Sequence, residues 1–380
     1  MSSKHSGGRI TFAVLALACC LLSSNPAASE TLGRPLPAPE TSRPPLDSSL
    51  TPYVACRRDV AGERSGSVPA IMPDLAVRWT LAFRTQQRGA QFSMPPPYAG
   101  PQGRLSPTLQ EFLDGERQFA FMTRELTSVD RASFRRAHGG RDPITIPVAM
   151  GSFRHFGFVD TMVFVVHQDN PITGLTFAQL DGIYSADRLR GHAPVRTWGD
   201  LGLTNPQWKD RPVVALGGGR RGVEDSAKAV VVRQRILSTQ AREGVWNDRL
   251  PVMGDGDDNV PSWVAKSPGA IGITVLSQMK PGVKAIALAA DESGAFVVPT
   301  MSNVYEGRYP LLRSVDLLLA PAANGAADPV LSEWARFMLS SEGQGVVLEQ
   351  GVFLPLRGEF LKQARARLAA VEGACPPDSR

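Results

Sequence analysis

Residues 160–185 read DTMVFVVHQDNPITGLTFAQLDGIYS and combine the pattern of a buried strand with the start of a helix. The run TMVFVVH is rich in β-branched side chains, and the turn-forming letters DNP close it. Thr176 and Gln179 then have the spacing of a capping box at a helix N-terminus. A strand that leads directly into a helix is typical of an α/β protein.

The same alternation extends over most of the chain. Residues 68–84 place apolar side chains at intervals of four, which predicts an amphipathic helix with Pro69 near its first turn. Helices are also predicted at residues 106–116 and 127–140. Strands are predicted at residues 118–122, 211–218, 269–276 and 314–321. The fold class expected from residues alone is therefore α/β.

The N-terminus has the layout of a secretory signal peptide over residues 1–29. Basic residues precede an apolar run at residues 10–22 that is too short to span a membrane, and small residues follow it. We therefore expect export to the periplasm, with lipid attachment at Cys19 or Cys20 as the alternative. Residues 30–52 are rich in Pro and Ser and predict an extended tether.

Two cysteines remain beyond the leader, Cys56 and Cys375, one near each end of the mature chain. In an oxidising compartment their simplest state is one disulfide that ties the two ends together. Two unpaired thiols are the alternative, because spacing along the sequence does not establish bridging distance.

Composition and motifs exclude several classes of function. The chain has 380 residues and a formal net charge of +5, and its Lys and Arg residues are spread along it, so nucleic acid is not an expected partner. The five histidines are scattered, so no metal site is expected. There is no G-x-S-x-G nucleophile motif. We therefore expect neither an enzyme nor a bound cofactor.

Residues 213–232, VVALGGGRRGVEDSAKAVVV, place a glycine cluster between a strand pattern and a helix pattern. The glycines formally satisfy G-x-G-x-x-G, but a dinucleotide is not expected in an exported protein, and the Lys of a phosphate-binding P-loop is missing. Amide groups at a helix start beside Arg220 and Arg221 can bind an anion. A plain turn with two solvated arginines is the alternative.

Several stretches, in the right order, resemble the PstS-type phosphate-binding proteins of ABC importers, which belong to the periplasmic-binding-protein superfamily. Besides residues 160–185, these are residues 66–83 (GSVPAIMPDLAVRWTLAF), 109–126 (LQEFLDGERQFAFMTREL), 309–319 (YPLLRSVDLLL) and 331–356 (LSEWARFMLSSEGQGVVLEQGVFLPL). The resemblance implies a type II periplasmic-binding fold with two α/β lobes and a ligand cleft between them. Lobe 1 would comprise residues 53–147 and 290–365, lobe 2 residues 148–289, and a C-terminal tail residues 366–380.

The resemblance also implies a ligand and the residues that hold it. The ligand would be phosphate or another small oxyanion. The protein would bind it as a monomer and deliver it to an ABC permease in the inner membrane. When the family's motifs are matched to this sequence, the candidate ligand-binding residues are Ser67, Thr123, Arg124, Asp160, Arg220, Arg221 and Gly222. Asp160 is the candidate acceptor of a proton from the ligand, which would reject sulfate at neutral pH; capping a turn is its alternative role.

The chain departs from the family pattern at two of these sites. Val68 and Pro69 stand where the family carries a polar residue and a threonine, and GGGRRGVED stands where it carries GR-x-x-x-SGT. Each lost donor to a charged ligand is worth about 1.5–3 kcal/mol. The alternative function is therefore an envelope sensor or interaction protein on the same fold, without phosphate transport.

Overall fold

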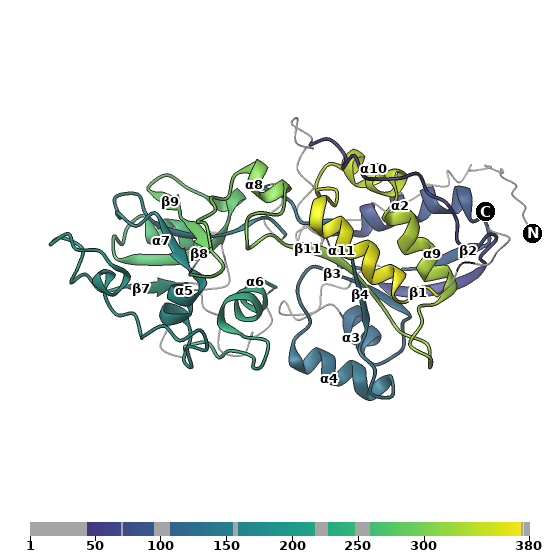
Figure 1. The fold of residues 1–380 in the computed structure, drawn as a ribbon, viewed down its shortest axis with the longest axis horizontal. Coiled ribbons are helices and arrows are strands. Elements are labelled where there is room, and N and C mark those ends of the chain that lie inside the picture. Colours follow the sequence, from purple (N-terminus) through teal and green to yellow (C-terminus); the bar gives the residue numbers. More distant parts are fainter. Residues whose placement is uncertain are drawn as a thin grey trace, which may run out of the picture. The chain divides into compact units, whose positions relative to one another are not determined.

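The computed structural model describes residues 44–69, 71–94, 107–154, 159–216, 227–247, 259–292, 294–373 and 375. Within these residues the chain forms two mixed sheets with helices packed on their faces (Figure 1). The predicted α/β class is confirmed.

The first sheet contains five of the described strands, in the order β2-β1-β3-β11-β4. The strands are β1 (Gly62–Ser67), β2 (Ala90–Ser93), β3 (Phe119–Met122), β4 (Ile144–Met150) and β11 (Ser314–Leu319). β1 is parallel to β2 and β3, whereas β11 is antiparallel to both β3 and β4. The carboxyl ends of β1, β3 and β4 therefore lie at the same edge as the amino end of β11.

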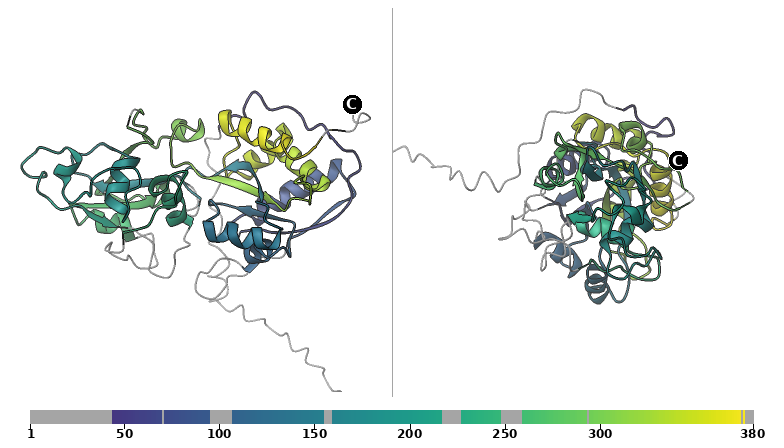
Figure 2. Two further views of the ribbon diagram at one scale, coloured as in Figure 1. Left: turned by 60° about the horizontal axis from the view of Figure 1, so that its bottom comes forward. Right: turned by 90° about the vertical axis from the view of Figure 1, so that its left-hand side faces the viewer.

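Side chains of β3 alternate between two hydrophobic layers, as the two-residue period of a strand requires. Phe119 and Phe121 pack into the larger core, and Ala120 and Met122 pack into a smaller one. Helices α2 (Pro73–Gln86), α9 (Pro329–Met338), α10 (Ser341–Gln350) and α11 (Gly358–Ala369) contribute to the larger core, and α3 (Pro107–Leu113) and α4 (Ser128–Ala137) contribute to the smaller one. The first sheet is thus covered on both faces (Figures 1 and 2).

The second sheet has the order β7-β8-β5-β9 among the described strands. They are β5 (Met162–His167), β7 (Val214–Leu216), β8 (Ala270–Val275) and β9 (Val283–Ala285). The further elements of this region are β6 (Gly174–Thr176), β10 (Ala287–Ala289), α5 (Phe177–Tyr184), η1 (Trp198–Leu201), α6 (Ala227–Val232), the π-helical turn η2 (Arg233–Leu237), α7 (Val260–Val264), η4 (Leu276–Gln278) and α8 (Met301–Tyr305). β6 and β10 pair with each other in parallel.

The strand and the helix predicted from residues 160–185 are confirmed as β5 and α5. The hydroxyl of Thr176 accepts from the amide of Gln179, and the Gln179 side chain accepts from the Thr176 amide. The predicted position of Pro69 is wrong. Helix α2 begins four residues later because Pro73 occupies its first turn, where a missing amide proton costs nothing.

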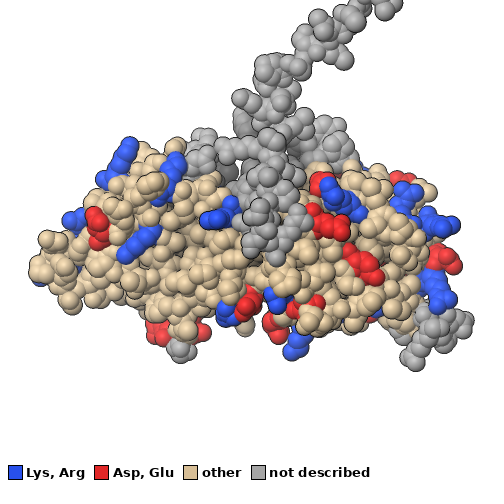
Figure 3. Space-filling view, turned by 90° about the horizontal axis from the view of Figure 1, so that it is seen from above, with Lys and Arg blue, Asp and Glu red and all other residues tan. Residues whose placement is uncertain are grey.

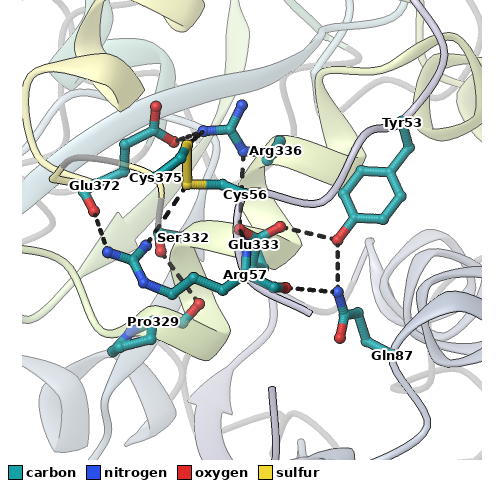
Figure 4. The surroundings of a disulfide bond; sticks show 10 residues. All are labelled: Tyr53, Cys56, Arg57, Gln87, Pro329, Ser332, Glu333, Arg336, Glu372 and Cys375. Carbon is teal, nitrogen blue, oxygen red and sulfur yellow. Dashed lines mark hydrogen bonds and ion pairs between the residues drawn. A yellow bond between two sulfur atoms is a disulfide. The ribbon is translucent and has the colours of Figure 1, made fainter. Parts of the chain in front are cut away.

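The segment that precedes β1 is bound to α9 and to the C-terminus. Cys56 forms a disulfide with Cys375, 319 residues away (Figure 4). Beside it, the buried carboxylate of Glu333 accepts hydrogen bonds from the Arg57 amide at 2.7 Å and the Tyr53 hydroxyl at 2.9 Å. Burial raises the pKa of the Glu333 carboxyl and also that of the Tyr53 hydroxyl. The two ends of the body are thereby joined covalently and by hydrogen bonds.

On the face drawn in Figure 3, Lys and Arg side chains predominate in the upper left of the view, and side chains of both signs are mixed on the right. Among the described residues, no helix has the length and apolar character to cross a bilayer.

Candidate functional site

Four of the predicted ligand residues lie within the described part of the chain, and each lies at or near the end of a strand. Ser67 is the last residue of β1, and Thr123 and Arg124 come directly after β3. Asp160 lies two residues before β5. Ser67, Arg124 and Asp160 are all buried. Since the carboxyl ends of β1 and β3 share an edge, topology brings Ser67 and the Thr123–Arg124 pair to the edge where α/β sheets commonly bind ligands.

Arg124 is held by a buried ion pair. Its Nη1 lies 2.6 Å from an Asp130 carboxylate oxygen and 2.8 Å from the Glu125 carbonyl oxygen. Asp130 is the third residue of α4 and forms a capping box with Thr127. Burial opposes ionisation of Asp130, but the hydrogen bond and charge of Arg124 and the Thr127 amide outweigh it, so the pKa of Asp130 is lowered.

Two further donors of the Arg124 guanidinium have no acceptor among the described residues. Within the described residues, its Nε and Nη2 are buried and make no hydrogen bond. A buried donor without a partner costs about 1–3 kcal/mol. An anion that accepted from these two groups would remove that cost, since a guanidinium presents its donors as a planar fork that matches oxyanions.

Asp160 is fully buried and lies in the connection between β4 and β5, two residues before β5. The Ser152 hydroxyl donates a hydrogen bond to its Oδ1. The loop is closed by the Ser152 amide, which donates to the Val159 carbonyl at 3.1 Å, and by the Thr161 amide, which donates to the Ser152 carbonyl at 3.0 Å. This geometry fixes the carboxylate, and its predicted role as a proton acceptor stays a prediction.

Sequence reasoning missed Arg313, which comes directly before β11. Its side chain is fully buried, and its Nη2 donates to the Thr123 carbonyl oxygen at 2.6 Å. Burial lowers the pKa of this guanidinium to about 10. The available signal was an arginine inside the apolar run YPLLRSVDLLL, where a charge is expensive unless other groups offset it.

Sequence reasoning also missed an ion pair between Glu125, three residues after β3, and Arg235 of the π-helical turn η2. The Glu125 carboxylate accepts from Arg235 Nε at 2.5 Å, and Arg235 Nη1 also donates to the Leu312 carbonyl. No local spacing connects residues 110 positions apart, so the sequence contained no signal for this contact. It places a further arginine beside the end of β3.

The remaining predicted ligands, Arg220, Arg221 and Gly222, lie outside the described residues. Within the part of the chain that the structure describes, no group of three or more His, Cys, Asp or Glu side chains could hold a metal ion.

Comparison with known proteins identifies the family. The profile of the PBP superfamily domain matches residues 73–342. The chain belongs to this superfamily. It is also 32% identical over 320 residues to the phosphate-binding protein PstS of Pseudomonas aeruginosa in two strains, which covers 84% of this chain and 90% of the relative. This PstS-like chain thus matches its relatives over nearly their full length.

Similar proteins with solved structures have lower sequence identity to this chain. An ABC-type phosphate transport receptor from Vibrio cholerae is 18% identical, with a TM-score of 0.48 over 77% of this chain and 100% of the receptor. PstS from Borrelia burgdorferi is 15% identical, with a TM-score of 0.48 over 78% of this PstS-like chain and 99% of its own.

Asp316, in strand β11 of the first sheet, should make the stability of the protein depend on pH. Burial raises the pKa of its carboxyl to about 6 from 3.8, and within the described residues its Oδ1 is buried without a hydrogen bond. Between these two pKa values the native state binds more protons than the unfolded state, so Asp316 lowers the free energy of unfolding as the pH rises through this window. We expect Asp316→Asn to stabilise the protein by about 1–3 kcal/mol above the window and to have little effect below it.

Urea unfolding at several pH values measures this difference between the variant and the wild type. Asp142→Asn is the control with the opposite sign, because a hydrogen bond from Arg135 lowers the pKa of that exposed carboxyl. A gain from Asp316→Asn that did not change with pH would contradict the assignment to ionisation.

Proposed function

We propose that the chain is an exported solute-binding protein that holds phosphate or a related small oxyanion for an ABC importer. The observation that carries this proposal is the 32% identity over 320 residues to a protein named phosphate-binding protein PstS. Because the match covers 90% of that relative, the whole binding protein is compared and not one shared segment.

The local chemistry supports an anion as the ligand. Arg124 offers two buried donors without a partner among the described residues, and the hydroxyls of Ser67 and Thr123 lie on the ends of neighbouring strands. Asp160 would accept the proton of a hydrogen phosphate ion, a bond that sulfate cannot make at neutral pH. Binding and release would require no covalent step.

The same proposal includes the arrangement expected from the family. Residues 53–147 with 290–365 would form one lobe and residues 148–289 the other, and the ligand would lie between them. Arg220, Arg221 and Gly222 would reach it from the second lobe. Closure of two lobes about a hinge is a change that a permease can sense. The protein would act as a periplasmic monomer.

Titration calorimetry of the purified mature chain tests the ligand class. Phosphate, sulfate and methylphosphonate are titrated separately. We expect heat and a saturable isotherm with phosphate and weaker or no binding of sulfate. If none of the three anions bound or raised the melting temperature, transport would be contradicted and the sensor function would be favoured.

Replacement of Asp160 by asparagine tests its role as the proton acceptor. An amide can donate to a sulfate oxygen, so we expect Asp160→Asn to bind sulfate more tightly and phosphate more weakly, with the phosphate-to-sulfate affinity ratio reduced about tenfold or more. The affinities come from the same calorimetry. Asp181→Asn is the matched control, since Asp181 is an equally buried aspartate in α5. An unchanged ratio in Asp160→Asn would show that this carboxylate only closes its loop.

A further inference from the structure

Two polar contacts join the segment that follows β3 to the segment around the π-helical turn η2. Arg235 Nε donates to a Glu125 carboxylate oxygen at 2.5 Å, and the Ser128 hydroxyl donates to a Glu243 carboxylate oxygen at 2.6 Å. Glu125 and Ser128 belong to the proposed lobe 1, whereas Arg235 and Glu243 belong to the proposed lobe 2. Both contacts therefore cross the boundary that would open and close around a ligand.

On the lobe 1 side, these contacts start next to candidate ligand residues. Glu125 comes directly after Thr123 and Arg124, and its carbonyl oxygen accepts from Arg124 Nη1 at 2.8 Å. Ser128 is the first residue of α4, and Thr127 caps this helix. The short segment between β3 and α4 thus carries the Arg124 guanidinium and also the two groups that contact the other lobe.

On the lobe 2 side, Arg235 lies in a turn whose carbonyl groups are held by another arginine. The Arg190 guanidinium donates to the carbonyl oxygens of Arg235 at 2.6 Å, Ile236 at 2.5 Å and Ser238 at 3.2 Å. The last carbonyl groups of a helix have no partner within it, and Arg190 supplies donors for these three. Single π-helical turns are frequent at functional sites. Arg235 is therefore presented to Glu125 from a backbone that is held in place.

The ion pair between the lobes is only partly shielded from solvent, and it leaves one polar atom without a partner. The Arg235 and Glu125 side chains are 27% and 30% exposed. Within the described residues, Oε2 of Glu125 is buried and makes no hydrogen bond. Closure would remove water from this oxygen, which offsets part of the gain from the pair. A contact of this modest strength separates readily when a ligand enters or leaves.

We propose that Glu125, Ser128, Arg235 and Glu243 form a latch between the two lobes, which holds the site closed around a bound anion. This inference rests on the proposed function. The paired groups lie on opposite lobes, so they part when the lobes separate. A contact that favours the closed form raises ligand affinity without touching the ligand, because it increases the population of the form that binds. Loss of the latch should therefore weaken phosphate binding.

The direction of one effect distinguishes a latch from the general electrostatic field of the site. Glu125 is negative and adjoins Arg124 in the chain, so its charge alone would repel an anion. Neutralisation of Glu125 should then strengthen phosphate binding, whereas loss of a latch contact should weaken it. The Ser128 hydroxyl is uncharged, so its removal tests the second contact without a change in net charge.

Titration calorimetry with inorganic phosphate compares the wild type with Glu125→Gln, Ser128→Ala and the double variant. We expect the dissociation constant to rise about threefold in each single variant and about tenfold in the double variant. Glu111→Gln is the control, because it removes the same charge from a pair of similar exposure that lies within the proposed lobe 1. Glu111 and its partner Arg117 are 31% and 23% exposed and 2.8 Å apart. Affinity should not change in this control.

Small-angle scattering follows closure itself. The radius of gyration of the wild type should decrease as phosphate is added, and the double variant should need a higher phosphate concentration to reach the same value. Affinity that increased or stayed unchanged in Glu125→Gln, or stayed unchanged in Ser128→Ala, would overturn the latch while phosphate binding by the wild type stands. No phosphate binding by the wild type would overturn the proposed function itself, and this inference with it.

Discussion

Arg124→Met should reduce phosphate affinity about a hundredfold or more and also destabilise the fold. Each lost hydrogen bond to a charged ligand is worth about 1.5–3 kcal/mol, and Arg124 has two donors available among the described contacts. Loss of the guanidinium also leaves the Asp130 carboxylate buried without its ion pair, 2.6 Å long in the wild type. Breaking a buried pair in this way costs about 3–5 kcal/mol.

A second substitution separates the two effects. Arg124→Met combined with Asp130→Asn removes the unpaired charge but retains a side chain that can accept from the Thr127 amide, as Asp130 does at 2.8 Å. We expect urea unfolding to show recovery of most of the stability, while calorimetry shows no recovery of affinity. Arg78→Met is the matched control, since the Arg78–Asp74 pair is exposed and is worth at most about 1 kcal/mol. Normal affinity in the double variant would contradict a ligand role for Arg124.

Removal of the Cys56–Cys375 disulfide should have the second large effect. Replacement of both cysteines by serine should lower the free energy of unfolding by about 2–5 kcal/mol, because the unfolded chain loses a cross-link that closes a very long loop. Phosphate affinity should not change. Cys56 precedes the amino end of β1, whereas Ser67, Thr123 and Arg124 lie at the carboxyl ends of β1 and β3.

Denaturant unfolding with and without a reducing agent measures this effect. Reduction should destabilise the wild type to the level of the double serine variant and leave that variant unchanged. The hydrogen bonds of Glu333 to the Arg57 amide and the Tyr53 hydroxyl remain available in both cases, so part of the N-terminal segment should stay attached to α9. Equal stability of the oxidised wild type and the variant would show that these contacts alone hold the segment.

The sequence predicted the elements whose signals are local. The strand and capped helix at residues 160–185 are confirmed as β5 and α5, because β-branched alternation and a capping box depend on neighbours in the chain. The position of β11 between β3 and β4 had no such signal, since strand order depends on packing between distant segments. Motif resemblance singled out Thr123, Arg124 and Asp160 as candidates, but the pairing of Arg124 with Asp130 required the structure.

Arg313 illustrates why the candidate site was predicted only in part. An arginine in an apolar run could have been interpreted as an edge charge or as the end of a strand. Its burial follows from contacts with Thr123 and Gly151, which lie more than a hundred residues earlier in the chain. Electrostatic partners assembled in this way leave no periodic pattern along the chain.

The position of β11 also bears on how the protein acquires its fold. β3 pairs with β11 across nearly two hundred intervening residues, whereas the second sheet is built from one continuous stretch. Closing a long loop costs entropy before any contact compensates it, and non-local pairing slows folding. The first sheet therefore cannot be completed until the last third of the chain is present. Under the proposed export through a membrane as an extended chain, this order of events would delay the formation of the complete fold until translocation is nearly finished.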